Sequence, residues 1–220
     1  MRYLTEELYQ KLQLFPLPFD EDVSLTDLAE WGLDLDELFI QELLARDEWY
    51  LKYTPAQLKA LLFDQNGRII CQKLDDKILT LIRNFREQID DEWAEATAWV
   101  DSQRAQVALL ANEGMQKYLS LDLTESNIVR VNGLDSREVT IELWQGVDAS
   151  ESIILIFKNV RESFMGNIHH YDANWWLFDE ISVDDSGYYQ LYALFGNADY
   201  IGQLQVRFQD IEVQQKKLID

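Results

Sequence analysis

The sequence predicts an α+β protein with a helical N-terminal half and an antiparallel β C-terminal half. Apolar residues recur at helical spacing before about residue 122 and alternate with polar residues after it. Turn signals also divide the second half at short intervals. We therefore expect an acidic helical region over residues 1–120 and a β region over 121–220. At 220 residues these are either two small domains or regions packed as one unit.

Two helix starts are marked in the N-terminal region. Thr5 is a suitable cap for a helix led by Glu6 and Glu7, whose negative charges favour the positive end of a helix. The segment 54–57 reads Thr-Pro-Ala-Gln, which places Thr at a cap, Pro at the first helical position and Gln where it reaches back. We expect a capping box there.

The longest predicted element is a helix over residues 75–112. No Gly or Pro interrupts this span, and Gly114 is predicted to mark its end. Apolar or small residues follow at steps of three, four or seven: Ile78, Ile82, Phe85, Ile89, Trp93, Ala96, Val100, Val107 and Leu110. Half of a coiled coil or one long central helix both fit this pattern, and the irregular Trp and Ala positions favour the central helix. Its side chains predicted to enter the core are Leu79, Ile82, Phe85 and Ile89.

The second half predicts about six short strands. The segments with alternating or continuous apolar residues are 128–131, 139–143, 153–157, 175–183, 188–195 and 200–208. Residues 132–133, 184–187 and 196–199 carry the Asn, Asp and Gly typical of tight turns. These strands predict an antiparallel sheet or a small sandwich.

The charge is the least ordinary property of the chain. Forty acidic and nineteen basic residues give a net charge of −21, and residues 20–48 alone hold eleven acidic residues and one basic residue. Such a surface disfavours binding to nucleic acids and anionic membranes and attracts basic proteins. Solubility alone is the competing explanation for this charge.

The expected location is the cytoplasm. No window approaches the roughly 18 apolar residues of a membrane-spanning helix, and Glu6 and Glu7 leave no room for a secretory apolar region. A single cysteine, Cys71, forms no intramolecular disulfide, which fits a reducing compartment.

The motifs of common enzymes are missing from the sequence. It contains no phosphate-binding loop, dinucleotide fingerprint, paired-cysteine metal motif or nucleophile elbow. Two histidines and one cysteine also leave few ways to build a metal or nucleophile site. We predict no cofactor and no metal, and no catalytic residue can be assigned.

Four features bear on chemistry, and each has a structural alternative. His169 and His170, with Asp172 nearby, offer metal ligands, but neighbouring residues on a strand point to opposite faces, so ordinary loop histidines are favoured. Asp91 and Glu95 lie one helical turn apart, and without histidines at the same spacing a solvated face is favoured.

The other two features are a thiol and a group of aromatic residues. Cys71 has no base near it in the sequence, which favours a buried structural thiol. Aromatic side chains also gather in the strands, and core packing is favoured over ligand binding for most of them: Trp175, Trp176, Tyr188, Tyr189, Tyr192 and Tyr200.

Several segments resemble one protein family. They are Met-Arg-Tyr-Leu-Thr-Glu-Glu-Leu-Tyr at 1–9, Trp-Trp-Leu-Phe-Asp-Glu-Ile at 175–181, and the runs 187–195 and 204–212. Together they resemble an uncharacterised bacterial family, chiefly of Gram-positive species, that is a domain of unknown function. The resemblance implies a bacterial cytosolic protein and transfers no catalytic residues.

Two functions of different class follow from these observations. The favoured hypothesis is an acidic protein-interaction module, immunity-like or regulatory, that binds a basic partner. The alternative is a metal-dependent hydrolase built on carboxylates and His169 or His170. The residues predicted to bind a partner are Asp34, Asp36, Glu37, Trp175 and Tyr189.

Overall fold

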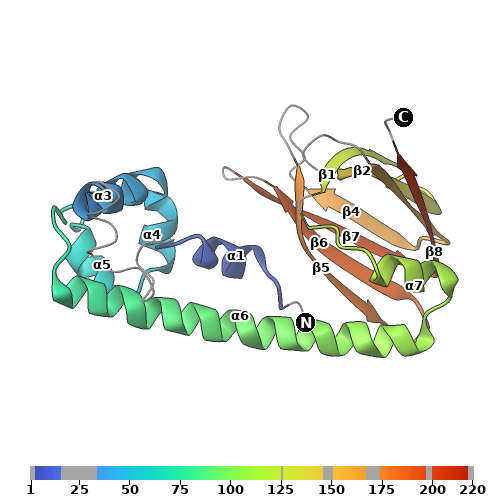
Figure 1. Cartoon of the computed structure of the whole chain (residues 1–220), viewed down its shortest axis with the longest axis horizontal. Helices are drawn as coiled ribbons and strands as arrows, with labels where there is room; N and C mark the ends of the chain where they lie inside the picture. Colours follow the sequence, from blue (N-terminus) through green and yellow to red (C-terminus); the bar gives the residue numbers. More distant parts are fainter. Residues whose placement is uncertain are drawn as a thin grey trace. The chain divides into compact units, whose positions relative to one another are not determined.

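A computed structural model describes residues 3–15, 34–124, 126–145, 151–166, 174–196 and 200–217 (Figure 1). The chain forms two compact units, a helical unit of Thr5–Glu95 and a β unit of Met1–Leu4 with Ala96–Asp220. The division lies inside the longest helix, so the change of period near residue 122 does not coincide with it. Helices precede strands along the chain, which confirms the predicted α+β class.

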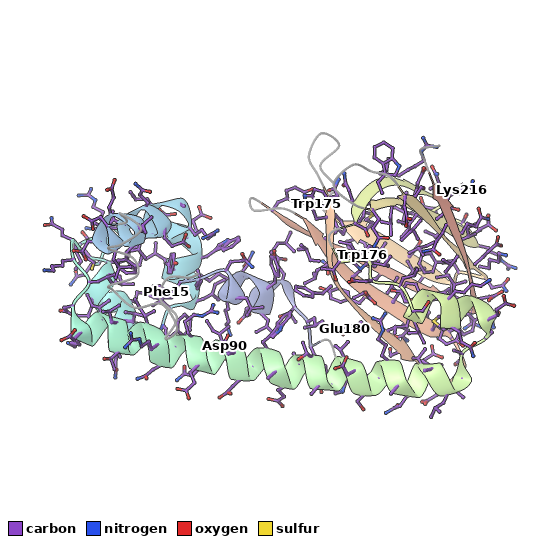
Figure 2. All side chains as sticks on the ribbon, viewed as in Figure 1. Phe15, Asp90, Trp175, Trp176, Glu180 and Lys216 are labelled. Atoms are coloured by element: carbon purple, nitrogen blue, oxygen red, sulfur yellow. The ribbon has the colours of Figure 1, made fainter. Side chains whose placement is uncertain are left out.

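The helical unit packs short helices with the first part of a long one. Its elements are α1 (Glu6–Leu12), α3 (Leu35–Ala45), α4 (Asp47–Tyr53), α5 (Ala56–Leu62) and the beginning of α6 (Asp76–Leu110). Phe15 lies in the core of this unit (Figure 2), with its ring centroid 4.7 Å from that of Tyr50 and 6.1 Å from those of Phe39 and Phe85. The Tyr50 hydroxyl accepts from the Phe15 N–H at 2.8 Å, and burial raises the pKa of this tyrosine.

One predicted helix cap is confirmed and the other is wrong. The Thr5 hydroxyl accepts from the Leu8 N–H at 3.2 Å and begins α1 as expected. Thr54 instead ends α4, because its own N–H donates to the carbonyl of Tyr50. No side chain caps α5, and within the described part of the chain the buried Thr54 hydroxyl has no hydrogen-bond partner. Only Thr54 and Pro55 separate the two helices, and the backbone of Thr54 already serves as the cap at the end of α4.

The long helix is confirmed and runs over Asp76–Leu110, with the Asp75 carboxylate accepting from the Ile78 N–H at its start. Its stripe of buried residues follows the predicted spacing: Ile78, Ile82, Phe85, Ile89, Ala96, Val100 and Val107. Leu79 is only partly buried, although it packs against the core. Leu110 is 64% exposed and does not belong to the stripe, contrary to the prediction.

Gly114 does not end this helix. Helix α6 ends at Leu110, and Ala111 and Asn112 connect it to α7 (Glu113–Leu119). The Asn112 side chain caps α7 by accepting from the Met115 N–H at 2.9 Å. Gly114 lies inside α7, where a Cβ atom would stand 1.8 Å from the carbonyl oxygen of Ile211. Glycine is therefore needed here for close packing of the helix on a strand, not for a turn.

Within its described residues, the β unit contains one antiparallel sheet of eight strands. In the order of the sheet they are β4 (Glu162–Gly166), β7 (Ile201–Phe208), β6 (Tyr189–Gly196), β5 (Trp175–Val183), β1 (Asn127–Asn132), β2 (Glu138–Gln145), β3 (Glu151–Lys158) and β8 (Asp210–Lys217). The prediction of about six strands did not include β4 or β8. Strand β4 is short, and β8 has only two strongly apolar residues, so neither gives a clear pattern.

The two ends of this strand order are joined through continuous chain. Strand β3 continues into β4 after three residues, and β7 continues into β8 after Gln209. The pairs Lys158–Asp210 and Glu162–Arg207 belong to one antiparallel ladder that bends between them. The sheet therefore curls back on itself, and inward side chains from both ends meet, with the Phe157 and Phe208 rings 4.8 Å apart. Two opposed parts of the curled sheet are visible in Figure 1.

A β-bulge in β5 decides which side chains of this strand enter the core. Trp176 pairs with Phe195 and Phe178 with Leu194, so Leu177 is an extra residue with no partner. As a result Trp176 and Asp179 lie on the same face although three positions separate them.

The carboxylate of Asp179 then connects three elements of the β unit. It accepts from Trp176 Nε1 at 3.3 Å, Arg104 Nη1 at 3.1 Å and the Tyr118 hydroxyl at 2.9 Å. The donors come from β5, α6 and α7. Burial and this neighbouring carboxylate raise the pKa of Tyr118 well above its usual value, which keeps the hydroxyl protonated as a donor.

Phe85→Ala is expected to destabilise the protein by about 3–5 kcal/mol, because it leaves a cavity beside Phe15 and Ile82. Thermal and denaturant unfolding measure the loss. The control is Arg83→Ala, on the exposed face of the same helix, which should change stability by less than about 0.5 kcal/mol. A loss below about 1 kcal/mol for Phe85→Ala would show that the buried face is assigned incorrectly.

Asp179→Ala is expected to cost about 2–4 kcal/mol, because the Tyr118 hydroxyl and the Arg104 guanidinium lose their shared acceptor in a mostly buried setting. The matched control is Asp185→Ala in the exposed turn after β5, expected within about 0.5 kcal/mol of the parent. If urea unfolding shows the two variants to be equally stable, the hydrogen-bond network around Asp179 is assigned incorrectly.

Candidate functional site

The outer face of β5, β6, β7 and β4 carries aligned rows of side chains. The register places Glu180, Tyr192, Gln205 and Phe164 in one row, and Ser182, Gln190, Arg207 and Glu162 in the next. These two rows, with Trp99 and Gln103 of α6, line a groove of about 710 Å³. A volume of this size suits a small molecule or a short peptide segment.

The middle of the groove is neutral and polar. Ser182, Gln190 and Gln205 present a hydroxyl and two amides, which both donate and accept hydrogen bonds. Phe164 adds an aromatic ring that is 49% exposed. An exposed ring beside amide side chains is a combination that suits contact with a chain of mixed polarity.

One end of the groove is a charged cluster around Arg207. Its guanidinium forms ion pairs with Asp184 at 2.6 Å and with Glu162 at 3.4 Å. Backbone N–H groups of the turn, that of Tyr188 above all, together with Arg207 lower the pKa of Asp184. This carboxylate therefore stays ionised at neutral pH and fixes the position of Arg207.

The other end of the groove holds the chain's own N-terminal segment. The backbone N–H groups of Tyr3 and Leu4 both donate to Oε1 of Glu180, the first at 2.8 Å. The Tyr3 ring also stacks on Trp99, with centroids 4.1 Å apart and planes 22° from parallel. Glu180 is buried and is labelled on β5 in Figure 2. Two residues that line the groove thus already bind the N-terminal segment, Glu180 through its main chain and Trp99 through the Tyr3 ring.

The carboxylates of the groove do not form a hydrolytic pair. Glu180 and Glu162 stand on β5 and β4, which are three strand spacings apart, or roughly 14 Å. Glycoside hydrolysis requires two carboxyl groups within about 10 Å of each other. Among the described residues no three His, Cys, Asp or Glu side chains form a group able to hold a metal ion.

Comparison with known proteins gives one family. The family described as "Protein of unknown function (DUF4085)" matches residues 3–200. The chain belongs to this family. No curated protein and no solved structure matches it. A search of the described helices finds none that is long and apolar enough to cross a membrane.

In this DUF4085 chain, all three predicted partner-binding acids already accept hydrogen bonds within the helical unit. The Asp34 carboxylate caps α3 by accepting from the N–H groups of Asp36 and Glu37 at 3.0 and 3.2 Å. Asp36 accepts from the Leu74 N–H at 2.7 Å. Glu37 is exposed, and its carboxylate accepts from the Gln41 amide. All three lie in the helical unit, whereas the groove belongs to the β unit.

The two predicted aromatic residues each begin a strand, and because β5 and β6 are antiparallel they lie at opposite ends of this strand pair. Trp175 begins β5, is 38% exposed and has Asn127 as its partner on β1, with Trp144 on the other side of Asn127. Tyr189 begins β6 and is buried in the core, with its hydroxyl donating to the carbonyl of Leu110. Tyr189 therefore presents no surface to a partner.

The other sequence features have simple surroundings where the structure describes them. Cys71 is buried, its thiol donates to the carbonyl of Lys73, and burial raises its pKa, so it is a poor nucleophile. Asp91 and Glu95 are exposed on α6. His169, His170 and Asp172 lie outside the described residues.

Sequence reasoning did not identify Glu180, Gln205 or Arg207. In β7, Gln205 and Arg207 alternate with the apolar Leu204 and Val206, and this pattern could have placed the two polar side chains on the outer face of the sheet. For Glu180 the signal was absent, because the bulge at Leu177 changes the phase of β5.

Glu180→Ala is expected to release the segment at Tyr3 and Leu4, because their N–H groups lose a charged acceptor. NMR hydrogen exchange at these two amides should accelerate by roughly tenfold or more, since a charge-assisted bond contributes about 1.5–3 kcal/mol. Glu180→Gln keeps a carbonyl acceptor and should have an intermediate effect. Glu162→Ala, which removes a carboxylate from the far side of the groove, should leave both amides unchanged, and an equal acceleration there would contradict the contact.

Proposed function

We propose that this protein is an interaction module that binds an extended segment of a basic partner protein in the groove of the β unit. The observation that carries the proposal is the binding of main chain by the groove itself. Glu180 accepts two successive backbone N–H groups, and Trp99 stacks on the side chain between them. Acceptance of main-chain N–H groups is a general way to bind extended peptides of varied sequence.

The rest of the groove supports the same function. Beyond Glu180 the floor offers the Gln190 and Gln205 amides for further main-chain contacts and the exposed ring of Phe164 for an apolar side chain. Peptides in extended conformation present side chains alternately, so polar and aromatic contacts at successive positions suit them. We assign no chemical step to this site.

The net charge of −21 provides the preference for a basic partner. The β unit alone has nineteen acidic and ten basic residues, so its field attracts cationic segments toward the groove. Such a field mainly raises the rate of association, whereas burial of groups in the groove determines the lifetime of the complex. An immunity-like or regulatory protein that occupies a cationic site on its partner fits these properties.

We place this activity in the bacterial cytoplasm. The family resemblance and the single cysteine, Cys71, which is free and fits a reducing compartment, support that location.

The test is selection from a random 12-residue peptide library followed by affinity measurement at low and moderate salt. We expect selected peptides rich in Lys and Arg, with NMR shifts at Gln190 and Gln205 and weaker binding as salt rises. Gln205→Arg should lower affinity at least tenfold, because it fills the groove and adds positive charge.

The matched control is Thr140→Arg, which makes the same charge change on the outer face of β2. It should alter affinity by no more than about twofold. Equal losses in the two variants would show that charge alone drives binding, and selection of no basic peptides would overturn the proposal.

A further inference from the structure

A second cavity of about 740 Å³ lies where strands of the β unit turn. It is bordered by the turn between β1 and β2 at residues 134–137, by the bend between β3 and β4 at residues 159–161, and by Gln209 between β7 and β8. The N–H of Val160 donates to the carbonyl of Arg137 at 2.9 Å and holds the first two segments together. The cavity is thus built by backbone contacts between segments that are distant in sequence.

Two arginines that form no ion pair with the described acids line this cavity. Five basic residues of the β unit form ion pairs with acids: Arg104, Lys117, Arg130, Lys158 and Arg207. Arg137 and Arg161 form none with the described residues, and both line the same cavity. Lys216, near the end of β8 (Figure 2), is also without such a pair and is not among the residues that line the cavity. In a unit with a large excess of acidic residues, two such arginines beside one cavity indicate an anionic ligand.

The guanidinium of Arg161 is held in place before any ligand binds. It lies 4.3 Å from the ring centroid of Tyr188, at a distance typical of a cation–π contact. Arg207 approaches the same ring at 5.1 Å, but its charge is already balanced by Asp184 and Glu162. Arg161 is therefore positioned by the Tyr188 ring, and among the described residues no acid forms an ion pair with it.

The remaining lining adds neutral donors and little negative charge. The side chains of Asn159 and Gln209 are exposed amides at the two bends. Two acids, Asp135 and Glu162, line the cavity. Glu162 forms an ion pair with Arg207, whereas Asp135 forms none with the described residues. Two guanidinium forks with amide donors beside them match the oxygens of a phosphate or carboxylate group.

We propose that this cavity binds a small molecule that carries an oxyanion, a phosphate monoester or a carboxylic acid, through Arg137 and Arg161. A small ligand is specified because the net charge of −21 repels long polyanions, whereas one oxyanion can be bound locally by two arginines. This cavity adjoins the peptide groove at Glu162 and Ser163, but Arg137 and Arg161 do not line the groove, and the proposed ligands have the opposite charge.

The test follows the side-chain Nε–Hε NMR signals of the arginines during titration with inorganic phosphate and, separately, with citrate at constant ionic strength. We expect saturable shifts at Arg137 and Arg161 with one common dissociation constant. Arg83 in the helical unit is exposed and has no acidic partner among the described residues, so it serves as an internal control. It should respond at least tenfold more weakly.

Variants then separate a specific site from general attraction. Arg137→Gln should abolish the saturable shift at Arg161, and Arg161→Gln should do the same at Arg137, with unchanged melting temperatures since both side chains are exposed. Tighter binding of phosphate identifies a phosphate ligand, and tighter binding of citrate identifies a carboxylate. Shifts that do not saturate, or that are equal at Arg83, would mean an adventitious ion only and would overturn the proposal.

Discussion

The extra residue Leu177 determines how β5 serves both faces of the sheet. Without the bulge, strict alternation would place Trp176 and Glu180 on one face and Asp179 on the other. The register instead turns Asp179 inward with Trp176 and turns Glu180 outward. The inward carboxylate binds α6, α7 and its own strand, and the outward one binds the N-terminal segment. The core and the candidate site therefore depend on the same local irregularity.

Burying two carboxylates on one strand is costly unless each is fully hydrogen-bonded, and the structure meets this requirement in different ways. Asp179 accepts only side-chain donors, which come from separate elements and fix their relative positions. Glu180 accepts backbone N–H groups, which carry no sequence preference. The first arrangement specifies one packing of the helices on the sheet. The second arrangement is suited to holding main chain of any sequence.

The sequence was sufficient for elements whose signals are local. The period of α6, the Thr5 cap and the turn at residues 184–187 each depend on residues within one or two turns of chain, and all three are found as predicted. The sequence was insufficient where an element distant along the chain determines the surroundings of a residue. Gly114 was interpreted as a helix end because its real constraint, the carbonyl of Ile211, lies almost 100 positions away. Tyr189 was predicted to bind a partner, whereas its burial depends on the neighbouring strands β5 and β7 and on Leu110 of α6.

The excess of acidic residues lowers stability through repulsion between like charges, and this cost bears on whether solubility alone explains the charge. The buried acids described above are balanced by donors, and within the described part of the chain most of the other acids lie on exposed or partly exposed side chains. On α6, Glu87, Asp91 and Glu95 are exposed and follow one another at intervals of four residues. Like charges at that spacing destabilise a helix by about 0.2–0.5 kcal/mol per pair. Solubility requires only a net charge and is achieved equally well with acids at other spacings. The stripe of Glu87, Asp91 and Glu95 therefore carries a small cost in helix stability that solubility alone does not require.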